Sequence, residues 1–172
     1  MKITHILFYI LLLLFIQCKK KEDSIPTVLT KYDIPYPKYV PTPFYNKYNE
    51  MTREGVDLGR LLYYDPILSN NGQSCASCHA QNLAFTTYES NSLPHFNLAW
   101  NNYFLWNGYV DGGLEMAMKF EVTHFFATNL SKLQDDPTYR ALFKKVYGSD
   151  QIAVEQVADA LSQFLASVQS FN

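Results

Sequence analysis

The sequence predicts an all-α fold, and three observations carry that prediction. Apolar residues recur at helical spacing in two segments near the C-terminus, 137–147 and 150–168. No stretch alternates apolar and polar residues for long enough to form a strand, and no internal repeat is present. The length of 172 residues suits one domain. We therefore expect a single helical domain at residues 47–172, preceded by a signal segment (1–18) and an extended arm (19–46).

The first 18 residues have the pattern of an export signal. A basic start, Met1-Lys2, precedes an unbroken apolar run at residues 6–16. A membrane-spanning helix needs about 20 apolar residues, so this run is too short to be one. We expect the chain to be exported.

Cys18 directly follows the apolar run and precedes a charged tract. This placement resembles that of the lipidated cysteine in bacterial lipoprotein signals, although Phe15-Ile16-Gln17 departs from the usual small residue before the cysteine. Acyl chains would anchor the protein firmly, because each buried methylene contributes about 0.8 kcal/mol. We expect lipidation at Cys18 and a location in the periplasm or cell envelope, anchored to the membrane through the N-terminal lipid. A soluble exported protein and an uncleaved anchor are the alternatives.

Residues 24–46 hold five of the eight prolines of the chain, interleaved with four tyrosines. Proline fixes φ and has no backbone donor, so this segment predicts an extended, polyproline-like arm. The tyrosines indicate that the arm lies along the domain surface, whereas a simple tether from the membrane is the alternative.

The helices have recognisable ends in the sequence. Thr52 can cap a helix that Asp65-Pro66 ends, and a loop at 69–72 follows. Residues 83–113 show no clean period and many turn formers, which predicts loop-rich structure with short helices. Asp136 and Pro137 open the next helix, and Gly148 ends it. The last helix is expected to start near Asp150 and to bury an apolar stripe formed by Val154, Val157, Leu161, Leu165 and Val168.

The charge balance excludes one broad class of partner. Lys and Arg number 14 against 16 Asp and Glu, which gives a net charge of −2. Apart from Lys19-Lys20-Lys21, the basic residues form no run, so nucleic acid is not an expected partner. Aromatic residues make up 16% of the chain, which suits either an aromatic core or a pocket for a large planar cofactor.

The sequence Cys75-Ala76-Ser77-Cys78-His79 predicts covalent haem. Two cysteines three residues apart place both sulfurs on one side of a helical turn, where they can form thioethers with the haem vinyl groups, and the next histidine is the axial iron ligand. A thioredoxin-like redox pair would need a βαβ setting, which is absent from the pattern. A zinc site would need four ligands, with His95 and His124 in an unusual arrangement. One such motif predicts one haem c.

A family resemblance extends well beyond this motif. The run NEMTREGVDLGRLLYYDPILS at 49–69 resembles the T-x-E-G-V-x-L-G-R-x-L-F-Y-D-P-x-L-S opening of bacterial di-haem cytochrome c peroxidases and their MauG-type relatives. Later blocks, including Leu105-Trp106-Asn107-Gly108 and the segments around 136–143 and 160–164, are similar too. The resemblance covers about residues 30–172. It implies a cytochrome c-like domain equivalent to the first of the two haem domains of that family.

The resemblance assigns roles residue by residue. Cys75, Cys78 and His79 match the haem attachment and axial positions. Trp106 matches a tryptophan between the two haems that is thought to help electrons cross, and a buried core indole is the alternative role. Asn97 matches an asparagine that helps to hold calcium in some relatives. Its partner ligands would come from the second domain, so a complete calcium site is not expected in this chain.

The departures from the family bear on catalysis. Relatives that reduce peroxide carry a Gln and a Glu on the open haem face, where a carboxylate can act as general acid and base. The matching positions here are Ala117 and Ala127, and Tyr109 replaces the family arginine. The carboxylates Glu115 and Glu121 fall out of register, so we expect both to be solvated on the surface.

The sixth position of the iron has two candidates. His95 lies sixteen residues after His79, a separation at which some resting family enzymes carry a distal histidine. His124 lies in the segment that normally carries the distal acid. An ordinary core or surface histidine is the alternative for each. Ligation by either would suit electron transfer better than peroxide binding.

The sequence thus predicts an exported, mono-haem redox protein related to di-haem cytochrome c peroxidase, with hydrogen peroxide as a candidate substrate. The alternatives are an electron-transfer or haem-sensing module without turnover, and a truncated fragment lacking the second haem domain. The expected partners are an electron-donor protein or a separate haem domain, and the membrane through the lipid anchor. An isolated first domain would expose an apolar patch that such a partner, or a second copy, could cover.

Overall fold

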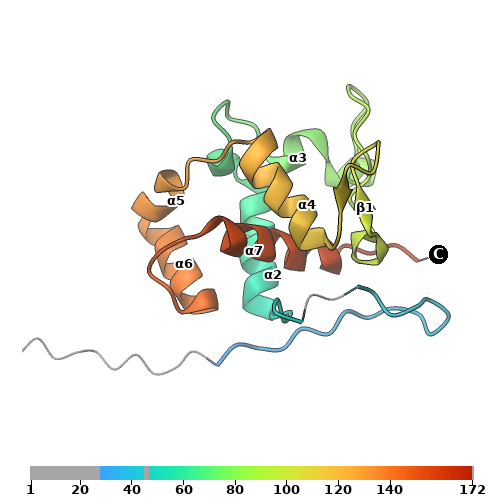
Figure 1. Cartoon of the computed structure of the whole chain (residues 1–172), viewed down its shortest axis with the longest axis horizontal. Coiled ribbons are helices and arrows are strands. Elements are labelled where there is room, and N and C mark those ends of the chain that lie inside the picture. Colours follow the sequence, from blue (N-terminus) through green and yellow to red (C-terminus); the bar gives the residue numbers. More distant parts are fainter. Residues whose placement is uncertain (1–27, 45–46, 172) are drawn as a thin grey trace, which may run out of the picture.

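The computed structural model describes residues 28–44 and 47–171. The signal segment and the lipidation site at Cys18 lie outside these residues. The described chain is mainly helical, as predicted (Figure 1). No helix in the described ranges combines the length and the apolar character that crossing a membrane requires.

The elements in chain order are α2 (Arg53–Tyr64), η1 (Pro66–Leu68), α3 (Cys75–Cys78), η2 (Gln81–Leu83), η3 (Leu98–Trp100), β1 (Tyr103–Phe104), β2 (Val110–Asp111), α4 (Leu114–Phe120), η4 (Glu121–Phe125), α5 (Ser131–Asp135), α6 (Pro137–Tyr147) and α7 (Val154–Ser167).

Helix α2 begins and ends where the sequence predicts. The Thr52 hydroxyl accepts a hydrogen bond from the backbone N–H of Gly55 at 3.0 Å, which satisfies a free donor of the first turn. At the other end, the Asp65 carboxylate accepts from the N–H of Ile67 at 2.8 Å and starts η1. The buried face of α2 is mainly apolar, and Leu62 and Tyr63 are fully buried.

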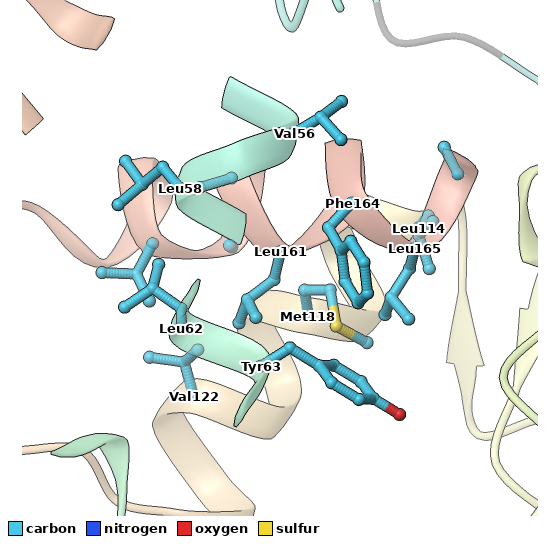
Figure 2. Close-up of a cluster of buried hydrophobic side chains, with 14 of the residues drawn as sticks. Val56, Leu58, Leu62, Tyr63, Leu114, Met118, Val122, Leu161, Phe164 and Leu165 are labelled. Atoms are coloured by element: carbon cyan, nitrogen blue, oxygen red, sulfur yellow. The ribbon is translucent and has the colours of Figure 1, made fainter. Parts of the chain in front are cut away.

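The core lies where α2, α4 and α7 meet. Helices α2 and α7 pack closely because Gly59 has no side chain at their contact, and a Cβ there would collide with the backbone carbonyl of Ala160. Figure 2 shows Leu62, Met118 and Leu161, one from each of the three helices, in the same cluster of apolar side chains. This packing gives a rigid base from which the loops of the site extend.

Helix α6 also matches its prediction. The Asp136 carboxylate accepts from the N–H groups of Thr138 and Tyr139 at 2.8 and 3.1 Å. Gly148 ends the helix with φ of 70°, in the left-handed region that glycine adopts without a steric cost.

Helix α7 begins at Val154, four residues later than the expected start near Asp150. The amide side chain of Gln134 explains the difference, because it donates to the carbonyl of Asp150 at 2.7 Å and accepts from the N–H of Ile152 at 2.9 Å. These bonds hold the segment before α7 as a turn. Of the predicted stripe, Val154 and Val168 are only partly buried.

The middle of the chain contains elements that the sequence pattern did not reveal. Strands β1 and β2 form a two-stranded antiparallel hairpin, with Tyr103 opposite Asp111. Two-residue strands are too short to show alternation. Helix α4 continues directly into η4, a π turn in which the N–H of Phe126 bonds to the carbonyl of Glu121 at 2.9 Å.

The described part of the arm, residues 28–44, has no helix and lies against the domain (Figure 1). Backbone bonds attach it at two places: the N–H of Tyr32 donates to Met51 at 3.0 Å, and that of Phe44 donates to Ala99 at 2.8 Å. Ile34 is buried in the core. This part of the arm therefore belongs to the domain instead of hanging free.

Candidate functional site

Helix α3 is a single turn that carries both cysteines of the motif. The Ser77 hydroxyl accepts from the N–H of Ser74 at 3.0 Å, which closes the start of the turn. Cys75 and Cys78 are half-buried free thiols. Burial raises the pKa of Cys75 to about 12, so this thiol stays protonated at neutral pH. A thiol of that kind is unsuited to disulfide exchange, which proceeds through a thiolate.

His79 follows α3 directly, and the backbone of Phe85 orients its ring. Nδ1 lies 3.1 Å from the carbonyl oxygen of Phe85. A carbonyl can only accept, so Nδ1 carries the proton and Nε2 keeps a free lone pair. Burial lowers the pKa of His79, which favours the neutral ring that a metal requires.

The loop after His79 adopts an unusual backbone to place that carbonyl. Ala84 and Phe85 have φ of 55° and 57°, two consecutive residues in the left-handed region. Such a conformation costs a non-glycine residue of order 1–3 kcal/mol and persists only where the surroundings enforce it. Here Ala80 and Thr86 pair as a β-bridge, and the N–H of Phe85 donates to Ala80 at 2.9 Å.

His95 is brought face to face with His79. The two rings are stacked, with 3.4 Å between centroids and 12° between planes. The backbone N–H of His95 donates to the same Phe85 carbonyl at 3.2 Å. Burial, and secondarily the charge that His79 would carry, lowers the pKa of His95 to about 3. Both rings are therefore neutral at physiological pH.

A cavity of about 400 Å³ opens beside the two histidines. Its size falls within the range of about 300–1,000 Å³ typical of cofactor and ligand sites. Three regions supply most of the rest of its wall: the 91–96 loop, the hairpin with Trp106, and one side of α4 with its continuation.

Glu121 also lines this cavity, which corrects the expectation that it is a solvated surface residue. It is half-buried at the start of the π turn, and burial raises the pKa of its carboxyl. Glu115 is half-buried too, but it lies outside the cavity and accepts a hydrogen bond from the Asn49 amide at 3.0 Å. Counting along the family pattern missed Glu121 because the side chain reaches the site from a helix and not from the later loop.

Ala117 and Ala127 match the positions of the Gln and Glu in the family pattern, and they lie in different surroundings. Ala117 is buried and lines the cavity. Ala127 is exposed, has φ of 45°, and its carbonyl accepts from the Asn70 amide at 3.1 Å. Tyr109, at the position of the family arginine, is exposed and meets Phe120 edge to face at 5.9 Å between ring centroids.

Trp106 lies at the edge of the cavity and not in the core. Its side chain is 66% exposed, so the alternative of a buried core indole is wrong. The indole N–H donates to the carbonyl of Asn91 at 2.7 Å. This bond fixes an aromatic ring between the cavity and solvent.

His124 and Asn97 are not brought to the two stacked rings. His124 is exposed, stacks on Phe120 with 4.7 Å between centroids, and lies 2.7 Å from the Thr123 hydroxyl through Nδ1. The Asn97 amide exchanges two hydrogen bonds with the backbone of Ser170, at 2.8 and 2.9 Å. Its oxygen thus already has a partner in this chain.

The donor set fits a covalently attached haem. Two thiols on one helical turn, followed by an imidazole that lines a cavity and is protonated on Nδ1, would supply both the attachment atoms and an axial ligand. The stacked rings of His79 and His95 would have to part to admit an iron between them. Within residues 28–44 and 47–171, no three His, Cys, Asp or Glu side chains are grouped so that they could share a metal ion.

Comparisons with known proteins point in the same direction. The model of the di-haem cytochrome c peroxidase family matches residues 53–172. The methylamine utilization protein MauG of Methylorubrum extorquens is 32% identical over 154 residues, which cover 78% of this chain and 42% of that protein. Cytochrome c551 peroxidase of Nitrosomonas europaea is 30% identical over 129 residues, with 63% and 38% covered.

Among solved structures, a MauG-like protein associated with microbial copper homeostasis has a TM-score of 0.70 and 27% sequence identity. The match covers 82% of this chain and 48% of that one. The chain thus spans less than half the length of these similar proteins.

Proposed function

The chain belongs to the di-haem cytochrome c peroxidase family, and from this premise we propose that it is a redox domain carrying one covalent haem c. Cys75 and Cys78 would hold the haem and His79 would be its axial ligand. The observation that supports this most directly is the Phe85 carbonyl 3.1 Å from Nδ1 of His79, which gives this cavity-lining ring the tautomer with its lone pair on Nε2. When bound, the haem supplies an iron that gains and loses one electron.

Electron transfer is the activity that the site favours. His95 is held beside His79, is neutral, and lies at the same cavity. We propose that it occupies the sixth position of the iron in the resting protein. A second strong-field imidazole leaves no open position for a substrate, so the domain would pass electrons and not bind peroxide in that state.

Peroxide reduction is the second candidate, and Glu121 is the specific observation that supports it. Reduction of hydrogen peroxide to two waters consumes two protons and two electrons. The Glu121 carboxylate, at the cavity wall, could take a proton from one peroxide oxygen and deliver it to the leaving oxygen. The electrons would come from a donor protein or a separate haem domain. His95 would first have to leave the iron.

The proposed partner surface includes the exposed part of the cavity wall. Tyr103 and Trp106 are exposed and line the cavity, and Tyr109, Met116 and Phe125, on the hairpin, α4 and η4, are exposed as well. We propose that an electron-donor protein or a second haem domain covers this surface, and that Trp106 lies on the route of the electrons. Export through residues 1–18 and lipidation at Cys18 would place the domain at the periplasmic face of a membrane.

Expression of the full chain in a bacterium that matures c-type cytochromes tests the proposal. The wild type should carry haem that survives denaturing electrophoresis and gives a c-type pyridine haemochrome spectrum, and the double variant Cys75→Ala, Cys78→Ala should carry none. Wild-type protein without covalent haem would refute the proposal. The ferric visible spectrum then separates the two activities: a low-spin spectrum indifferent to peroxide supports electron transfer, and a spectrum that changes with peroxide supports reduction.

A further inference from the structure

We infer that Tyr63 is a positioning residue, whose hydroxyl holds His95 beside His79 in the tautomer needed for an axial ligand. The inference rests on the proposed haem function and goes beyond it by assigning a role to a residue outside the motif.

Tyr63 touches both histidines from the middle of the core. Its hydroxyl donates to the backbone carbonyl of His79 at 3.2 Å and lies 3.3 Å from Nδ1 of His95. The residue as a whole is fully buried. One oxygen atom therefore links the motif that attaches haem to the second histidine.

Counting hydrogens selects one arrangement of these two contacts. A phenol has one hydrogen, and the carbonyl of His79 can only accept. Both contacts are satisfied when the hydroxyl donates to that carbonyl and its oxygen accepts from Nδ1–H of His95. The lone pair is left on Nε2, which is the atom that a metal takes when Nδ1 donates to a second partner.

Tyr63 is suited to this role because its ring is packed in the core. Its ring packs against Phe85 and Phe164, with centroids 6.1 and 5.1 Å away, and it belongs to α2 in the central packing. His95, in contrast, lies in the segment 87–97, which has no helix or strand. The bonds to Tyr63 and to the Phe85 carbonyl attach that segment to the rigid base.

The hydroxyl is also a departure from the family sequence pattern. Tyr63 stands where the pattern matched by residues 52–69 has phenylalanine. The aromatic ring thus serves packing at this position, and the added oxygen is available for another purpose. The substitution Tyr63→Phe removes that oxygen and leaves the ring that the pattern prefers.

The test uses the haem-loaded full chain and cyanide, which competes with His95 for the sixth position of the ferric iron. Tyr63→Phe should reduce the low-spin fraction of the visible and electron paramagnetic resonance spectra, and should raise cyanide affinity roughly five- to tenfold, the effect of one hydrogen bond. Tyr64→Phe is the matched control, because that hydroxyl bonds to the exposed Gln81 side chain at 2.9 Å, and it should leave both readouts unchanged.

A double-mutant cycle distinguishes positioning from a general structural effect. If Tyr63 acts through His95, Tyr63→Phe should add nothing to the cyanide affinity of a His95→Phe variant. Equal additional effects in both backgrounds would overturn the inference, and so would a Tyr63→Phe protein with wild-type spectra and affinity. A wild type with covalent haem but a high-spin spectrum would overturn it too, while leaving the haem function intact. Absence of covalent haem would instead overturn the proposed function itself.

Discussion

The rings of His79 and His95 lie parallel, 3.4 Å apart between centroids, and one carbonyl bonds to both residues. Phe85 accepts from the side chain of His79 at 3.1 Å and from the backbone of His95 at 3.2 Å. The Phe85 carbonyl therefore sets the orientation of the His79 ring and holds the backbone of His95 next to it. This shared anchor makes His95, rather than His124, the histidine to test as a second ligand.

Replacing His95 should change the spin state of the haem. His95→Phe is expected to turn a low-spin ferric spectrum into a high-spin one, because the iron would lose the proposed second imidazole. His124→Phe is the control and should have no effect, since His124 stacks on Phe120 away from the cavity. Visible spectroscopy of the two purified variants decides the point. The opposite result would make His124 the ligand.

Replacing Glu121 should slow any reaction with peroxide. Glu121→Gln keeps the shape of the side chain and removes the proton acceptor, so the rate of peroxide consumption is expected to fall about 10²- to 10⁴-fold. Stopped-flow mixing of the ferrous protein with peroxide measures it. Glu115→Gln, outside the cavity, should leave the rate unchanged.

The family position for the acid offers a complementary experiment. Ala127 is exposed and is not among the residues that line the cavity. Ala127→Glu is therefore expected to give no rescue of a Glu121→Gln protein. A recovered rate would show that the loop after η4 can reach the haem, and would argue for a decayed catalytic pocket.

A methyl group at the crossing of α2 and α7 should destabilise the fold. Gly59→Ala would drive a Cβ into the Ala160 carbonyl, and overpacking of this kind costs about 3 kcal/mol of unfolding free energy. Urea unfolding followed by circular dichroism measures the loss. Arg60→Ala, on the exposed side of the same helix, should change stability by less than about 0.5 kcal/mol. A Gly59→Ala protein of wild-type stability would contradict the tight crossing.

Asp159 should make stability depend on pH. Its pKa is raised from 3.8 to about 6, first by burial and then by repulsion from Glu115 and Glu155. The folded protein thus favours the protonated form, and the stability this provides is complete below pH 3.8 and lost as the pH rises through about 6.

Asp159→Asn removes the charge and should therefore be more stable than the wild type above pH 6. The gain should be about 1 kcal/mol, since the carboxyl is only half-buried and solvent screens it. It should shrink as the pH falls toward 4. Unfolding curves at several pH values test this, with the exposed Asp57→Asn as control. A gain independent of pH would exclude the carboxyl as the cause.

Local chemistry explains what the sequence could predict. Thr52, Asp136 and Gly148 act on backbone groups within a few residues of themselves, so the ends of α2 and α6 follow from short stretches of sequence. The motif at 75–78 lies on one helical turn, as its spacing indicates, and covalent haem at this motif stays a prediction.

What the sequence could not predict depends on contacts between distant segments. The start of α7 is set by Gln134, whose side chain bonds across a separation of 16 and 18 residues. Glu121 reaches the cavity only because α4 packs on α7 and presents that side of its last turn to the histidines. The link from Tyr63 to His95 spans 32 residues and cannot be inferred from either stretch by itself.

The π turn at 121–125 is a place where the chain could change length by one residue. A π turn holds one residue more than an α-helical turn, so loss of a single codon there would restore regular helix. The turn absorbs its extra residue locally, so the side chains before and after it keep the faces that they would have in a regular helix. This wall of the cavity could therefore gain or lose one amino acid without disturbing α4 or the segment that follows.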